Sequence, residues 1–110
     1  MPFESKTESG YTIVEVDETR LDASIAESFK TYLFEQIEGG ATSMVIDLSL
    51  VRFMDSSGLG SLVAALKKLT GQGSLKLAGA QPAVVDLFSL TSMDRLFTIA
   101  SSVAEAVEDQ

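Results

Sequence analysis

Hydrophobic and polar positions divide the chain into segments that alternate between strand-like and helix-like patterns. The stretch Tyr11–Val16, "YTIVEV", is rich in β-branched residues and predicts a strand. Residues 3–7 predict an edge strand before it, joined to it through Ser9-Gly10. Short apolar runs at three further places also predict strands. The expected strands cover residues 3–7, 11–16, 43–48, 74–79 and 95–100.

Between these strands, apolar residues recur every three or four positions, as they do on the buried face of a helix. The expected helices include the apolar positions of residues 25–37, 59–69, 84–88 and 103–107. Ser24 and Ser102 each begin a sequence that fits a capping box, in which a serine and the glutamate three residues later satisfy free backbone N–H groups. Gly39-Gly40 is expected to end the first helix, and Pro82 to occupy the first position of the third.

Strands that alternate with helices predict right-handed crossovers and a mostly parallel sheet. We therefore expect one α/β domain over residues 1–110, with helices packed on a single sheet. The sheet is expected to be mixed but mostly parallel, with four or five strands and about four helices packed on it.

Composition narrows the classes of function. The chain has 110 residues, 45% of them hydrophobic, which suits one domain with a real core. Its net charge of −8 disfavours nucleic acid as a partner, because the phosphates would repel it. No apolar run is long enough to predict a membrane span. The N-terminus lacks the pattern of a signal peptide, so we expect a cytoplasmic protein.

Cysteine and histidine are both absent. The sequence therefore offers no thiolate nucleophile, no zinc–thiolate site and no Ser–His–Asp triad. The glycine-rich phosphate loops of nucleotide-binding proteins are missing as well. We expect no catalytic residue, no bound metal and no cofactor, and a protein that is not an enzyme.

The stretch at residues 52–60, "RFMDSSGLG", follows an apolar strand and precedes an amphipathic helix. In a parallel sheet, such turns beyond the carboxyl ends of the strands are where functional groups gather. Asp55, Ser56 and Ser57 are all good helix N-caps, and one would suffice. Gly58 and Gly60 add a second oddity, since glycine in a helix costs about 0.5–1 kcal/mol relative to alanine.

Small residues continue along the helix that follows. Gly58, Ser61, Ala65 and Lys68 lie three and four positions apart, which places them on one face. We interpret this face as an outward docking surface that ends in a lysine. The alternative is that another part of the same chain covers it.

Phosphorylation suits the exposed hydroxyls of this turn better than catalysis does. A kinase brings its own base, whereas a serine nucleophile in this chain would have none. The phosphate would carry about −1.5 to −2 charges at pH 7. At the positive end of a helix that charge is favourable by roughly 0.3–1 kcal/mol. The fold should therefore tolerate the phosphate, and a docked partner should not.

Three stretches resemble the bacterial anti-sigma-factor antagonists, the STAS domain family: "DLSLVRFMDSSGLGSLVAALKKL", "RLDASIAESF" and "LTSMDRLFTIASSVAEAV". The resemblance implies a sheet with helices on one side. It also implies partner switching, in which the unphosphorylated protein binds an anti-sigma factor that is a serine kinase of the histidine-kinase-like ATPase type. Binding frees the sigma factor. Phosphorylation releases the antagonist, and a PP2C-type phosphatase resets it.

Carried over by motif position, the resemblance makes Ser56 the phosphoacceptor, with Ser57 as a cap or a minor acceptor. The positions that it implies for the partner surface are Asp22, Asp55, Ser57, Gly58 and Gly60. This sequence departs from the family in two places. Thr19-Arg20-Leu21-Asp22 stands where a Gly-Glu-Leu-Asp run is common, and a glycine commonly found near Ser92 is missing.

Two other functions remain open. One is a STAS-type adaptor of a transport or stress-signalling assembly that makes no use of phosphorylation. The other, less favoured, is a small enzyme or nucleotide-binding protein. Even as a switch protein, the chain could serve secretion or motility instead of transcription. We expect a monomer that is able to dimerise weakly.

Overall fold

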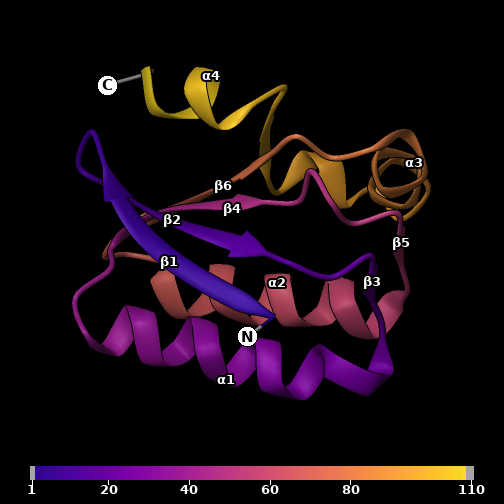
Figure 1. Cartoon of the computed structure of the whole chain (residues 1–110), viewed down its shortest axis with the longest axis horizontal. Helices are drawn as coiled ribbons and strands as arrows, with labels where there is room; N and C mark the ends of the chain where they lie inside the picture. The colour runs from indigo at the N-terminus through magenta and orange to yellow at the C-terminus, as the bar shows by residue number, and fades with distance from the viewer. Residues whose placement is uncertain (1, 109–110) are drawn as a thin grey trace.

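Five strands form one mixed sheet in the computed structural model, which describes residues 2–108 (Figure 1). They are β1 (Phe3–Glu8), β2 (Tyr11–Val16), β4 (Ser43–Asp47), β6 (Ser74–Ala78) and β7 (Thr98–Ala100). Their order across the sheet is β1-β2-β4-β6-β7. β1 pairs antiparallel with β2, and every other neighbouring pair is parallel. The expected mixed, mostly parallel sheet is confirmed.

The antiparallel pair is closed by the two residues predicted to join it. Ser9 and Gly10 have φ values of 54° and 84°, and Glu8 pairs directly with Tyr11. Positive φ at both loop positions is typical of the tight hairpin turns whose twist matches that of the strands. The turn therefore fixes the register that places Phe3 opposite Val16, both in the main core.

Three helices close the main core against one face of the sheet. They are α1 (Ala23–Glu38), α2 (Ser56–Leu69) and α3 (Pro82–Leu90). Each contributes the predicted apolar stripe, with Phe29, Leu62 and Phe88 fully buried. Figure 1 shows α1 and α2 side by side beneath the sheet, with α3 at its end. None of the described helices has the length and apolar character needed to cross a membrane.

The fourth helix, α4 (Val103–Glu108), lies on the opposite face (Figure 1). Its Ala106 and Val107 pack on Ile13 and Val45, which face away from the main core. The Lys76 ammonium donates a hydrogen bond to the carbonyl oxygen of Ala106, at 2.9 Å. The expectation of helices on one side only is therefore wrong, because apolar strand residues on the second face also need cover.

Two short elements lie outside the predicted set. β3 (Arg20–Leu21) and β5 (Phe53–Met54) form a separate parallel pair just before α1 and α2. With two residues each, they carry no alternating pattern that sequence inspection could detect.

Several strand boundaries differ from expectation by one residue, and two larger differences concern the first helix and the last strand. α1 begins one residue after Asp22, which is its N-cap, so the predicted capping box at Ser24 is wrong. The last strand starts at Thr98, because Met93–Arg95 forms a 3-10 turn, η1. Ser92 precedes that turn with a φ of 60°, a conformation that glycine adopts more readily.

Candidate functional site

The small β3–β5 pair brings the starts of α1 and α2 together (Figure 1). Leu21 pairs with Met54 in parallel register, and the Asp55 N–H points to the Leu21 carbonyl oxygen at 3.4 Å. Asp22 and Asp55 are the next residues of the two strands, and each begins a helix. Two segments 33 positions apart in the sequence therefore present equivalent strand–aspartate–helix junctions at one edge.

Both aspartates cap the helices that they begin. The Asp55 carboxylate accepts hydrogen bonds from the N–H groups of Ser57 and Gly58, at 2.9 and 3.1 Å. Asp22 accepts bonds from the N–H and hydroxyl of Ser24, at 3.0 and 2.6 Å. These Ser24 bonds, with a lesser contribution from Arg20, lower the pKa of the Asp22 carboxyl below its ordinary value. Of the three candidate caps for α2, Asp55 is the one used.

Ser56 is the first residue of α2, and its side chain is exposed. Within residues 2–108, no group hydrogen-bonds to its hydroxyl, so the cap does not depend on it. Ser57 is half-buried and lies beside α1. The turn therefore presents an exposed hydroxyl, on Ser56, beside a cap that Asp55 already provides.

The small residues of α2 face inward, which corrects the interpretation of an outward docking strip. Gly58, Ser61 and Ala65 are all buried. A Cβ on Gly58 would lie 2.2 Å from the Leu21 carbonyl oxygen, and the Ser61 hydroxyl donates to the Ala26 carbonyl oxygen of α1 at 2.8 Å. Small side chains are needed here because α2 packs closely on β3 and α1. The alternative, that the chain itself covers this strip, is confirmed.

Lys68 also belongs to this internal contact. Its ammonium lies 3.2 Å from the Glu38 carboxylate and 4.9 Å from the centre of the Phe34 ring. Both partners are on α1, so Lys68 joins the ends of the two helices. The interpretation of Lys68 as the outward end of a docking strip is therefore wrong, because its ammonium group pairs with α1 of the same chain.

Gly60 differs from Gly58. It is exposed, and a Cβ added to it would meet no atom within 4 Å. It lines a shallow groove of about 330 Å³ between the first turns of α1 and α2. The groove is lined by Ala23, Ala26, Glu27, Lys30, Ser57, Gly60, Ser61 and Ala64. Internal packing therefore gives no reason for a glycine at position 60.

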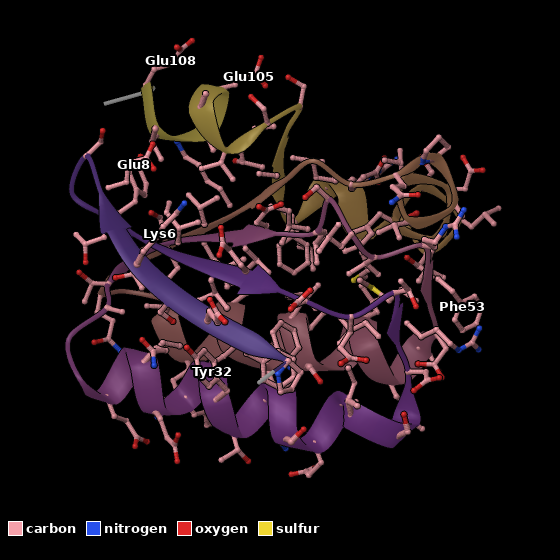
Figure 2. The ribbon with its side chains drawn as sticks, viewed as in Figure 1. Lys6, Glu8, Tyr32, Phe53, Glu105 and Glu108 are labelled. Atoms are coloured by element: carbon pink, nitrogen blue, oxygen red, sulfur yellow. The ribbon has the colours of Figure 1, made fainter. Side chains whose placement is uncertain are left out.

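Phe53 is a surface feature that the sequence reasoning missed. Its side chain is 41% exposed and is labelled in Figure 2. The Arg20 guanidinium lies 4.4 Å from the centre of its ring. The two residues are direct partners in the β3–β5 register. Arg20 also reaches the Asp22 carboxylate at 3.2 Å. The sequence could have indicated this pair by position alone, since Arg20 and Phe53 each lie two residues before a helix-capping aspartate.

Comparison with known proteins shows that the chain matches a known domain family and has relatives of similar sequence. The STAS domain model matches residues 3–106. A Thermotoga maritima protein, provisionally named an anti-sigma factor antagonist, is 31% identical over 91 residues, which cover 81% of this chain and 80% of that protein. BtrV of Bordetella bronchiseptica, named in the same provisional way, is 28% identical over 83 residues, or 74% and 72% of the two chains.

The fold agrees as well. The crystal structure of a Thermotoga maritima protein of the same provisional description superimposes with a TM-score of 0.85 at 28% identity. The match covers 97% of this chain and 92% of that one. The expected fold and the resemblance noted in the sequence are both confirmed.

Proposed function

The chain belongs to the STAS domain family of anti-sigma factor antagonists, which are regulators without catalytic activity, and we propose that phosphorylation of Ser56 switches it. Unphosphorylated, it binds an anti-sigma factor that is also a serine kinase of the histidine-kinase-like ATPase type, and the sigma factor is freed. Phosphorylation of Ser56 ends that binding, and a PP2C-type phosphatase restores it. The observation that carries this proposal is the exposed Ser56 hydroxyl, which the helix cap does not use.

The fold should tolerate the phosphate. Asp55 already satisfies the backbone N–H groups of Ser57 and Gly58, so modification of Ser56 removes no cap. The added charge lies at the positive end of α2, where it gains roughly 0.3–1 kcal/mol. The neighbouring carboxylates of Asp22 and Asp55 oppose that gain, so the net effect on folding stability is expected to be small.

A partner docked over the same turn should not tolerate it. A group of about −2 charge that meets like charge, or loses its water, costs several kcal/mol. Since each 1.4 kcal/mol is about a factor of ten in affinity, the phosphate is expected to weaken binding about 100-fold or more. No movement of the backbone is required for this effect.

Gly60 supports close approach by a partner. Glycine within a helix costs about 0.5–1 kcal/mol, and no internal contact explains it at this position. We infer that the partner covers the turn and the adjoining groove, in contact with Asp22, Asp55, Ser57 and Gly60. Gly58, Ser61, Ala65 and Lys68 are left out of this surface, because they serve the α1–α2 contact.

The test is site mapping with purified kinases. The parent, Ser56→Ala and Ser57→Ala are each incubated with ATP and the histidine-kinase-like serine kinases of the source organism, and the products are analysed by mass spectrometry. We expect one phosphate on the parent and on Ser57→Ala, located at Ser56, and none on Ser56→Ala. Labelling of Ser56→Ala at the parent rate would show that the assignment is wrong.

A second candidate is an adaptor that docks without phosphorylation. The groove beside Gly60 favours it, because that feature suits docking whether or not Ser56 is modified. Cells that carry only the Ser56→Ala variant distinguish the two proposed functions. Loss of signal-dependent control favours the switch, whereas unchanged control favours the adaptor.

A further inference from the structure

Large apolar side chains are exposed in one part of the molecule. Among residues 2–108, the exposed large apolar residues are Leu50 (54% exposed), Phe53 (41%), Val85 (38%), Leu90 (85%) and Leu96 (52%). All of them lie either on the segment that leads into β5 and on β5 itself, or on α3 and at the end of the η1 turn that follows it. Scattered exposed apolar residues need no explanation, but their restriction to two segments does.

These two segments lie against each other. α3 contacts β5, and η1 contacts α3. The Gln81 side-chain amide, at the start of α3, donates to the Ser49 carbonyl oxygen at 2.8 Å. Figure 1 shows α3 and β5 together at one end of the molecule. We call the five apolar side chains with these supporting segments the α3–β5 surface.

The α3–β5 surface carries charges of both signs, because the exposed Asp86 and Asp94 lie on α3 and η1. It is therefore less acidic than the chain as a whole. The sequence has a net charge of −8 and three arginines, Arg20, Arg52 and Arg95. Arg20 lies over the Phe53 ring, while Arg52 and Arg95 are sequence neighbours of Phe53 and Leu96. Within residues 2–108, neither Arg52 nor Arg95 forms a salt bridge. Arginine and aromatic residues are both enriched at protein–protein interfaces.

We propose that the docking site of the kinase partner extends from the Ser56 turn onto the α3–β5 surface, and that the partner presents apolar side chains there, with carboxylates opposite Arg52 and Arg95. This inference rests on the proposed function. Phe53 lies three residues before Ser56, so the docking site and the phosphoacceptor form one continuous region. The guanidinium groups of Arg52 and Arg95 form no salt bridge within the described residues, so they are available to pair with carboxylates of a partner. An acidic partner would also be repelled by a phosphate on Ser56, which agrees with the direction of the switch.

The test measures affinity for the kinase that phosphorylates Ser56, by titration calorimetry with ADP present. Three variants change the surface: Phe53→Ala, Leu90→Ser and Arg52→Glu. Lys67→Glu is the matched control, because Lys67 is exposed on α2 and forms no salt bridge within the described residues. Circular dichroism and thermal unfolding establish that each variant is folded; these side chains are exposed, so all should be.

We expect Phe53→Ala to weaken binding about 30-fold and Leu90→Ser about 5-fold. Arg52→Glu is expected to weaken binding about 10-fold at low salt and less at high salt, because salt screens the charge contribution. Lys67→Glu should bind within about twofold of the parent. Tighter binding of Arg52→Glu would show that the partner is not acidic and would overturn that part of the proposal.

The outcomes separate this inference from the proposed function. If the kinase binds the parent and all three surface variants equally, and phosphorylation of Ser56 still weakens binding, the α3–β5 surface is wrong and the switch stands. If no kinase binds the parent, both proposals fail. If sedimentation shows a dimer of this chain that Leu90→Ser dissociates while kinase affinity is unchanged, the surface belongs to a second copy and the proposal is overturned.

Discussion

Replacing Gly58 with alanine tests why the signature turn contains this glycine. The new Cβ would lie 2.2 Å from the Leu21 carbonyl oxygen and 3.0 Å from side-chain carbons of Leu21 and Met54. The carbonyl belongs to the backbone of β3, which is paired with β5, so no side-chain rotation relieves the clash. The start of α2 must instead move away from β3 by roughly 1 Å to restore an ordinary contact.

Two opposing effects set the magnitude. Overpacking of this kind costs about 1–3 kcal/mol. Replacement of a helical glycine by alanine stabilises the folded state by about 0.5–1 kcal/mol. The net expectation for Gly58→Ala is a loss of about 1–2 kcal/mol in the free energy of unfolding.

Gly60→Ala is the matched control, two residues along the same helix. Its Cβ would meet nothing within 4 Å, so only the gain in helix propensity remains. The assay is urea unfolding at 25 °C, followed by circular dichroism. With a slope of about 1–3 kcal/mol per M urea, the midpoint of Gly58→Ala should fall by about 1 M and that of Gly60→Ala should rise by about 0.5 M.

Equal midpoints for the two alanine variants would refute the reasoning. That result would mean that β3 and α2 can move apart at little energetic cost, and that Gly58 is not required for the internal contact. The docking interpretation of Gly58 would then have to be reopened.

Three further predictions follow from particular contacts. Ser92→Gly should raise the free energy of unfolding by about 0.5–1 kcal/mol, since the φ of 60° at Ser92 is strained for a residue with a Cβ; urea unfolding measures this, and a destabilised variant would contradict it. Ser61→Ala should cost about 1 kcal/mol through loss of the buried hydrogen bond to Ala26, and an unchanged urea midpoint would show that the bond contributes nothing. The pKa of Asp22 is lowered in the folded chain, so its contribution to stability is present above the ordinary aspartate range and is lost as pH falls through the lowered value. Parent and Asp22→Asn should therefore converge in stability on acidification below about pH 4, and parallel pH profiles would contradict the assignment.

Much of the fold could be predicted, because its elements are long enough to show their period. β2 has the predicted bounds, and the stripe of Phe29, Leu33 and Ile37 on α1 is buried as expected. Elements that depend on tertiary contact were missed. β3 and β5 have two residues each, and they exist as strands only because they pair with each other.

The residues of the site could be predicted from the sequence, but not the direction in which the small side chains of α2 face. Sequence placed Asp55, Ser56 and Gly58 at a helix start, which the structure confirms. It could not decide which face of α2 meets α1, because a strip of small residues suits both a close helix pair and an external partner. The buried Ser61 hydroxyl, 4% exposed and bonded to α1, decides between the two.

The central claim is that one phosphate on Ser56 controls binding without changing the fold. The most direct measurement compares the affinities of phosphorylated and unphosphorylated protein for the phosphorylating kinase by titration calorimetry, with urea unfolding of both forms alongside. The account predicts binding about 100-fold weaker for the phosphorylated form, with closely similar urea midpoints. Equal affinity of the two forms, or weaker binding accompanied by loss of the folded structure, would contradict it.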